Sequence, residues 1–188
     1  AFQFNSFNMA TLSGYLGILS TYIVLIYGIH AVILGSSIIS KEERDKTVEF
    51  SLTLPIGRSR LITFKSIAAL INIIALLMVF SGAVYVTSLN YDTIVDFNKF
   101  VYLMILSMFF VQLIFLSIGI MLGCIMKRYK RSGSTGVAII LITFFMSVLV
   151  GMSEDLENLK YFTPFKYFDL VKSLNELTID INYILLSL

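Results

Sequence analysis

Few residues of this chain could do chemistry inside a membrane, and they are scattered. His30 is the one residue among Asp, Glu, Lys, Arg and His within the four long apolar stretches set out below. An ionisable group at membrane depth is costly to bury and often marks a proton or substrate site. Because no carboxylate or second histidine lies in these stretches, we favour a neutral His30 that hydrogen-bonds to a neighbouring helix.

The motifs of nucleotide and metal chemistry are absent from the sequence. No GxxxxGK[ST] phosphate loop, HExxH or Cys-x-x-Cys occurs. The run Gly-Ser-Thr-Gly at 133–136 lacks a lysine and follows a basic turn, so we expect a helix start there rather than a phosphate cradle. The single Cys124 has no partner for an intrachain disulfide. The sequence therefore predicts no catalytic residue, no metal site and no cofactor site in this chain.

Polar and small residues in the apolar stretches have a second use, which is contact between helices. Asn72 and Gln112 are expected to form interhelical hydrogen bonds. Gly119 and Gly123 form a GxxxG pattern, which lets two helices approach closely, and Ala31 with Gly35 gives a weaker signal of the same kind.

The elements that must hold these residues are membrane-spanning helices. The chain has 188 residues, of which 57% are hydrophobic and 14% charged, whereas soluble domains are about a quarter charged. A helix needs about 20 apolar residues to cross a bilayer. Four stretches meet that length without Asp, Glu, Lys or Arg: 16–37, 67–89, 100–126 and 133–152. The predicted fold class is an all-α, polytopic transmembrane helical bundle in a lipid bilayer.

The distribution of basic residues predicts the orientation of the bundle. Ten of the 14 Lys and Arg residues lie in the segments 41–65 and 127–131. By the positive-inside rule these two segments face the cytoplasm, and residues 1–14, 90–99 and 153–180 lie outside. The cluster at 127–131 could also bind anionic lipid, although its orienting role suffices to explain it.

The ends of the sequence suggest a longer protein. The chain begins with Ala1, and its last apolar residues, Ile181–Leu188, are too few to span a bilayer. We expect one transmembrane domain over residues 1–188 that is incomplete at both ends, with four whole spans here out of six and with both termini in the cytoplasm. We expect a cell membrane, specifically the prokaryotic cytoplasmic membrane. The net charge of +2 gives no reason to expect a nucleic-acid partner.

The polar stretch Lys41–Lys65 is far longer than a turn between two helices requires. Its first part, Lys41–Leu54, is expected to form a helix along the cytoplasmic membrane surface. Pro55 disfavours helix in the residue before it, Gly57 permits a turn, and a new helix is expected from about Ser59.

The expected surface helix has apolar groups on two of its sides. Successive residues of a helix are placed about 100° apart around its axis. On this helix Glu42, Asp45 and Glu49 form an acidic sector, and Val48 and Leu52 lie along one edge of that sector. Phe50 and Leu54 form a second apolar edge on the opposite side. This pattern favours a helix held between two protein bodies over one resting on lipid.

The outer segment 153–180 mixes polar and aromatic residues. It is expected to form two short helices at the membrane surface, with an aromatic belt. The belt would comprise Tyr161, Phe162, Phe165, Tyr167 and Phe168.

The stretch EERDKTVEFSLTLPIGRSRLITFK, residues 42–65, resembles the cytoplasmic segment of ABC-2 type transporter permeases. The family pattern has an acidic start, a Gly-Thr-apolar-Glu core, a Thr or Ser, then Pro-[Ile/Val]-[Ser/Thr]-Arg and a closing lysine. The matching positions are Glu42, Thr47, Val48, Glu49, Thr53, Pro55, Ile56, Arg58 and Lys65. Lys46 stands where glycine is frequent, and Gly57 where Ser or Thr is usual. KYFTPFKYFD at 160–169 is similar to the segment that precedes the family's last helix.

The resemblance implies the membrane half of an ATP-binding cassette transporter. Two permease subunits or domains would pair with two cytoplasmic ATPase subunits, and ATP and Mg²⁺ would bind to the ATPase. The segment after the first span here would be the coupling helix, which docks in a groove on the ATPase. The residues expected at that contact are Glu42, Asp45, Thr47, Val48, Glu49, Phe50, Leu52, Leu54, Pro55, Arg58 and Arg60. The second permease could be another copy or a homologue, and the cargo and the direction of transport are left open.

Two other functions are weighed against this one. The chain could be a membrane-embedded enzyme that uses His30, although no second ligand or acid accompanies that histidine. It could also be a non-transporting sensor or assembly subunit, since a coupling-type helix does not by itself require transport.

Overall fold

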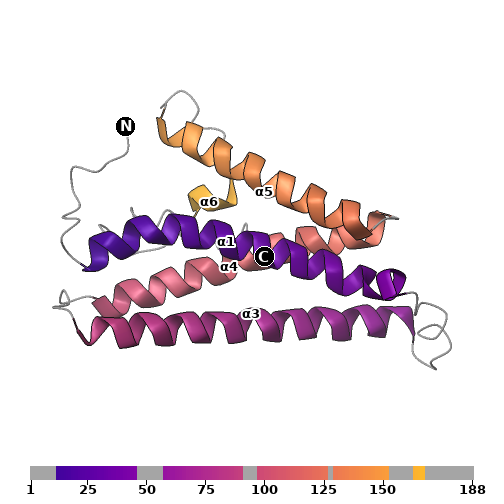
Figure 1. Cartoon of the computed structure of the whole chain (residues 1–188), viewed down its shortest axis with the longest axis horizontal. Coiled ribbons are helices and arrows are strands. Elements are labelled where there is room, and N and C mark those ends of the chain that lie inside the picture. Colours follow the sequence, from indigo (N-terminus) through magenta and orange to yellow (C-terminus); the bar gives the residue numbers. More distant parts are fainter. Residues whose placement is uncertain (1–11, 46–56, 91–96, 127–128, 153–162, 168–188) are drawn as a thin grey trace.

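The computed structural model describes residues 12–45, 57–90, 97–126, 129–152 and 163–167 (Figure 1). Within these ranges the backbone forms helices and no strands. The helices are α1 (Leu12–Asp45), α3 (Arg58–Ser88), α4 (Phe97–Ile125), α5 (Tyr129–Met152) and the short α6 (Pro164–Tyr167). The all-helical fold class is confirmed for this part of the chain.

Four of these helices are long and apolar enough to cross a membrane. The candidate spans are Tyr15–Ile39, Ser59–Ser88, Phe97–Ile125 and Arg131–Val150. Backbone groups find no hydrogen-bond partners in lipid, so an unbroken helix is the form such segments must take. Each of the four expected spans overlaps one of these helices over nearly its whole length, while the total of six stays a prediction.

The span in α3 begins earlier than expected. It starts at Ser59, eight residues before the expected Ile67. The expectation excluded Lys65 because of its charge, but a lysine near a helix end can lay its apolar stem in the membrane and keep its ammonium at a polar group. The expected helix start near Ser59 agrees with the observed start at Arg58.

The first span also ends later than expected. The surface helix was expected to begin at Lys41 as a separate element, but α1 continues without a break to Asp45. No proline or glycine interrupts the residues from Ile38 to Asp45, and Lys, Glu and Arg are good helix formers, so nothing stops the helix at the membrane surface. The rest of the expected surface helix, residues 46–54, lies outside the described residues.

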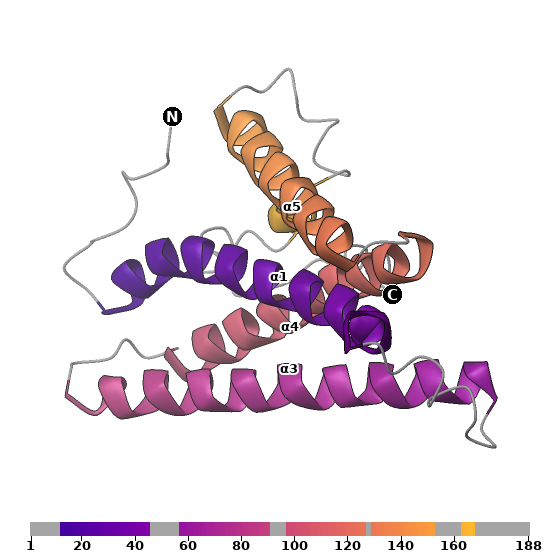
Figure 2. The same ribbon diagram turned by 45° about the vertical axis from the view of Figure 1, so that its right-hand side comes forward.

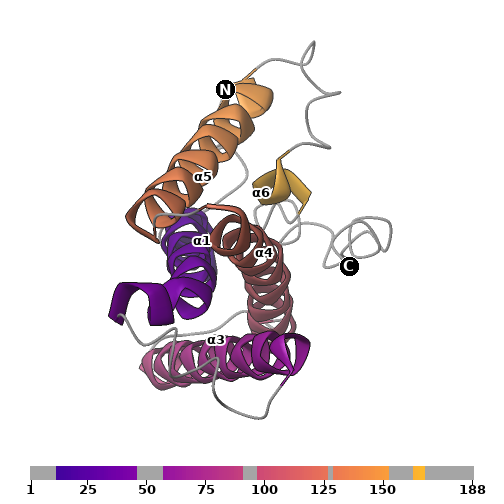
Figure 3. The same ribbon diagram turned by 90° about the vertical axis from the view of Figure 1, so that its right-hand side faces the viewer.

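Three helices form the body of the bundle and a fourth crosses it (Figure 2). α3 lies along one side of α1 and α4, and α5 crosses α1 at an angle on the opposite side (Figure 3). The most extensive contact is between α1 and α4, which run in the same direction. The end of α1, the start of α3, the end of α4 and the start of α5 therefore lie at one end of the bundle (Figure 1). The two basic segments flank this same end, as the positive-inside prediction requires.

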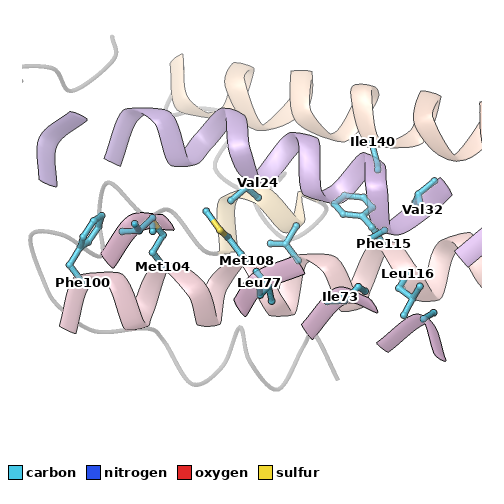
Figure 4. Packing of buried hydrophobic residues seen from close by; sticks show 14 of the residues in the cluster. Val24, Val32, Ile73, Leu77, Phe100, Met104, Met108, Phe115, Leu116 and Ile140 are labelled. Atoms are coloured by element: carbon cyan, nitrogen blue, oxygen red, sulfur yellow. The ribbon is translucent and has the colours of Figure 1, made fainter. Parts of the chain in front are cut away.

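The core centres on α4, whose buried side chains face α1, α3 and α5 in turn. Figure 4 shows Val24 of α1 over Met108 of α4, and Phe115 of α4 near Ile140 of α5. The fully covered apolar side chains, at 0% or 1% exposure, include Val32, Ile73, Phe100, Met104, Met108, Val111, Phe115 and Ile140. Close packing of this kind gains dispersion energy, which drives helix association where lipid is as apolar as the side chains.

The start of α5 differs from the sequence prediction. The Gly-Ser-Thr-Gly run was expected to begin a helix at Gly133, but α5 begins at Tyr129. The run therefore lies inside a helix, where its backbone N–H groups bond along the helix axis and are not free to cradle a phosphate.

Candidate functional site

The expected coupling segment is carried on two helical stems. α1 brings the chain to Asp45 and α3 takes it up again at Arg58. Gly57 forms the N-cap of α3 in an extended conformation, φ −63° and ψ 142°, and its carbonyl accepts the first helical bond from the N–H of Leu61 at 3.1 Å. This φ is open to any residue. Gly57 makes no side-chain cap, whereas the Ser or Thr usual here in the permease pattern would supply one.

A lysine joins the two stems. The Lys65 ammonium of α3 donates a hydrogen bond to the carbonyl oxygen of Ile39 in α1 at 3.5 Å, across 26 residues of sequence. Ile39 is the last residue of the candidate span of α1, so this bond lies at the end of that span. Lys65 therefore holds the beginning of α3 to the end of the first span.

The predicted contact residues fall into three groups in the structure. Glu42 and Asp45 belong to the last turns of α1, Arg58 is the first residue of α3, and Arg60 is exposed in the first turn of α3. The remaining seven, Thr47, Val48, Glu49, Phe50, Leu52, Leu54 and Pro55, lie outside the described residues. The structure thus brings the two ends of the predicted site to one end of the bundle, and its middle stays a prediction.

Glycines set the distance between α1 and α4. A methyl group at the Cβ position of Gly119 would lie 2.5 Å from the carbonyl oxygen of Val32 and 3.2 Å from the backbone nitrogen of Ser36. The corresponding position on Gly35 would lie 2.6 Å from the carbonyl oxygen of Leu116. On Gly123 it would lie 3.0 Å from the carbonyl oxygen of Ser36. Real Cβ atoms do not come this close to backbone atoms, so the two helices touch backbone to backbone only because these residues have no side chain.

Two further glycines of this packing were not singled out from the sequence. Gly28 of α1 faces the ring of Phe115, with 3.2 Å from its Cβ position to the ring, and Gly136 of α5 faces the side chain of Val32. Gly28 could have been predicted from the sequence, because it lies seven residues before Gly35 and residues seven apart share a helix face. Val32 is thereby enclosed by both α4 and α5, and its side chain is fully buried.

The polar residues of the spans do not form the expected interhelical bonds. Asn72 is exposed on α3. Gln112 of α4 is 0% exposed, and neither its amide nitrogen nor its amide oxygen has a hydrogen-bond partner within the described part of the chain. The Nδ1 atom of His30 is buried and lacks a partner there as well. The prediction of interhelical hydrogen bonds is therefore wrong for Gln112 among the described residues.

The described residues also offer no metal centre. No three His, Cys, Asp or Glu residues come together in these ranges in a way that could hold an ion. Cys124 is exposed. This part of the structure therefore provides no second metal ligand to accompany His30, as the alternative of a membrane enzyme would require.

A shallow apolar groove of about 270 Å³ lies between α3 and α4. Ile74, Met78 and Ser81 of α3 line it together with Tyr102 and Phe109 of α4. Its walls carry no charged group, so it fits apolar chains such as those of lipid rather than an ionic ligand.

The outer aromatic segment packs inward where it is described. Phe165 of α6 was expected in a belt at the membrane surface. Its ring instead lies 5.3 Å from that of Phe115 in α4 and 5.6 Å from that of Phe144 in α5, centroid to centroid. Thr163 beside it is 0% exposed. Rings at these separations attract one another edge to face or offset, which holds α6 in the angle between α4 and α5. Tyr161, Phe162 and Phe168 lie outside the described residues.

Comparison with known proteins agrees with this arrangement. The profile of a family described as "ABC-2 family transporter protein" matches residues 2–184. No curated protein and no solved structure matches the chain. The match takes in all four candidate spans, both stems and α6. The chain is a multi-pass membrane protein and belongs to the ABC-2 family of transporter proteins.

Proposed function

We propose that this chain is the membrane-spanning permease subunit of an ATP-binding cassette transporter, and that a separate cytoplasmic ATPase hydrolyses the ATP that moves its cargo. The observation that carries this proposal is the family match over residues 2–184. The sequence supports it, because it contains no phosphate loop and no carboxylate within the expected spans for coupling to an ion gradient. ATP and Mg²⁺ belong on the ATPase, and no nucleic acid takes part.

The segment 41–65 is the proposed contact with the ATPase. A change driven by ATP elsewhere can reach the cargo path only through a contact that differs between two states. The stems support this role, because α1 and α3 are long helices that run from the membrane core to the two ends of this segment. Lys65 joins them, so that a push on the segment acts on both helices together.

The remaining parts of the proposal follow from the family and the charges. A second permease, either another copy or a homologue, completes the path through the membrane. The chain lies in the cytoplasmic membrane of a prokaryote, with segments 41–65 and 127–131 on the cytoplasmic side, which their ten Lys and Arg residues support.

Capture of the ATPase by the tagged, full-length permease tests the proposal. The apolar side chains of the segment should carry the binding, because truncating a buried apolar anchor typically costs about 2 kcal/mol, or roughly a thirtyfold loss of affinity. We expect Phe50→Ala, Leu54→Ala or a Val48/Leu52 double alanine to lose ATPase capture and transport while the permease still inserts.

Arg60→Ala, which removes an exposed charge of the same predicted contact, should reduce ATPase capture less than the apolar variants, because exposed charges contribute little to binding. It should leave insertion unchanged and impair coupling moderately. Full capture and full transport by all three apolar variants would remove this segment from the contact. Capture of no ATPase by the unaltered permease would count against the proposed function as a whole. Capture without cargo movement would favour the sensor or assembly role.

A further inference from the structure

Gln112 is a polar side chain with no partner at the centre of the bundle. It lies one residue from the midpoint of α4, which runs from Phe97 to Ile125. It is 0% exposed, and both polar atoms of its amide lack hydrogen bonds within the described residues. A buried amide without partners costs about 1–3 kcal/mol in proteins. Such a group in a membrane-spanning helix therefore needs an explanation.

The position of Gln112 directs it toward α1. It precedes Gly119 by seven residues, or two helical turns, and so lies on the same face of α4. That face touches α1 at Val32, and one turn earlier Phe115 touches Gly28. Because α1 and α4 run in the same direction, Gln112 lies against the part of α1 around Val24 and Gly28. Gly28 offers no side chain there, and Val24 is apolar and 6% exposed.

Buried hydroxyl groups of these two helices are satisfied within their own helix. Ser107, also 0% exposed on α4, donates to the carbonyl oxygen of Leu103 at 2.8 Å. Ser20 of α1 donates to the carbonyl oxygen of Gly17 at 2.6 Å. A hydroxyl can use its own helix in this way. The amide of Gln112, on a longer side chain, makes no such bond. Among the described residues, Gln112 shares this lack of a partner only with the buried Nδ1 atom of His30, and Gln112 is the one side chain whose donor and acceptor are both left without partners.

A further helix packed around the bundle cannot supply the missing bonds. The side chain is fully covered, so a partner reaches the amide only if one of the elements that cover it moves. Because Gln112 shares the face of α4 that meets α1 at Gly119, the seam between α1 and α4 is the route that we consider. The seam is held most tightly at Gly35 and Gly119, on the side of Gln112 nearer the expected coupling segment.

We propose that Gln112 is a binding group for water that enters the α1–α4 seam when the two helices separate at this level. An amide both donates and accepts, so it stabilises water, or any neutral group with a donor and an acceptor. The closed seam and the hydrated seam are two arrangements of one interface, with the glycine contact as its pivot. Resting on the proposed function, the same opening admits the cargo, which should present neutral hydrogen-bonding groups to Gln112 rather than charge.

Thiol accessibility tests the proposal directly. Gln112→Cys is made in the full-length permease with Cys124 replaced by serine, reconstituted in phospholipid vesicles with its ATPase and no added cargo. Its reaction with a small water-soluble methanethiosulfonate is timed without nucleotide, with ATP and with vanadate. Ser107→Cys is the matched control, since it lies on the same helix and is equally buried. We expect the cysteine at 112 to react at least about tenfold faster than the cysteine at 107 in one of these states. A tenfold ratio means that the free energy of opening is lower at 112 by about 1.4 kcal/mol.

A second pair of variants keeps the proposal testable if the cysteine variant does not insert. Gln112→Leu removes the unpartnered amide and keeps an apolar filling, so it should raise the melting temperature and slow ATP turnover by the complex. Gln112→Asn, which keeps an amide, should preserve much of the turnover. A role in packing alone would not slow turnover in a more stable protein.

Equal, negligible reaction at 112 and 107 in every state overturns the inference. So does a Gln112→Leu protein that turns over ATP at the unaltered rate. The proposed function fails separately, if no ATPase associates with the permease. In that case the comparison of positions 112 and 107 in the reconstituted permease alone still decides the inference.

Discussion

Replacing Gly119 with alanine should force α1 and α4 apart. The added methyl group would lie 2.5 Å from the carbonyl oxygen of Val32, and 3.1 Å from its Cα. Ordinary contact begins at 3.4 Å, so relief requires a shift of 3.4 − 2.5 = 0.9 Å. Both partners are backbone atoms, and no side chain can rotate away to make room.

The cost follows from the packing of the whole interface. Overpacking costs about 1–3 kcal/mol, and a backbone clash between two long helices belongs at the upper end of that range. Alanine returns about 1 kcal/mol through its higher helix propensity. The net loss is then about 2 kcal/mol, or a melting temperature lower by roughly 4–8 °C in a chain of this length.

Gly82→Ala is the matched control for this prediction. It is also a mid-helix glycine in a candidate span, but nothing lies within 4 Å of its Cβ position in the structure. It should melt at or slightly above the temperature of the unaltered protein. The assay is thermal unfolding of the purified protein, followed by loss of the monodisperse peak. Gly119→Ala melting no lower than Gly82→Ala would refute the close contact.

The same contact makes Gly35 a second site of this effect. Its Cβ position lies 2.6 Å from the carbonyl oxygen of Leu116, so Gly35→Ala should cost about as much as Gly119→Ala. Once one substitution has separated the helices, the second clash is partly relieved. The double variant should therefore lose less stability than the two single losses added together.

Three further predictions concern the expected cytoplasmic end of the bundle and its ATPase. Ser59→Cys, made with Cys124 replaced by serine, should react with an impermeant thiol reagent in inside-out vesicles and not in intact cells; labelling in intact cells would reverse the topology. Lys65→Met should lower the coupling between ATP hydrolysis and transport while ATPase capture persists. Lys65→Arg should retain much of the coupling, because arginine keeps a cationic donor for the carbonyl of Ile39. Equal coupling in both variants would show that this hydrogen bond does not contribute to coupling. The permease purified without its ATPase should hydrolyse no ATP, and steady hydrolysis by a rigorously purified sample would contradict the assignment of ATP to the partner.

The sequence predicts the spans because long uncharged runs have few alternatives. A stretch such as 100–126 has no polar face to place in water, so a membrane helix is the structure that satisfies its backbone. The same property hides the packing. Apolar side chains surround each helix, and no single stripe indicates which face meets which neighbour.

Small residues give part of the missing information. Gly119 and Gly123 indicate which face of α4 is tightly packed, but the pattern does not name α1 as the partner. That pairing depends on the matching gap at Gly35 and Gly28, which is a property of two helices in a particular register. The inward position of Phe165 is unpredictable for a similar reason, because its ring fills a space that exists only once α4 and α5 have crossed.

The structure also limits how the proposed coupling can work. α1 is one helix of 34 residues, from Leu12 to Asp45 at the start of the expected ATPase contact. A force on the end at Asp45 is carried along the helix, because packed helices move as bodies rather than deform continuously. The tight contacts along that path are first that of Gly123 with Ser36 and then the crossing at Gly35 and Gly119, and the register of the two helices places the next turns of α1 at the level of Gln112. A small tilt of α1 about the glycine crossing would therefore separate α1 from α4 at the level of Gln112. Locking the two helices together beyond the crossing should have the opposite effect. Val24 of α1 lies over Met108 of α4 (Figure 4). A protein that inserts normally but has its helices cross-linked at positions 24 and 108 should keep Gln112→Cys unreactive in the presence of ATP, while a cross-link between α3 and α1 at positions 65 and 39 should not. Equal reactivity at 112 with and without the 24–108 cross-link would show that α1 and α4 do not separate at this level.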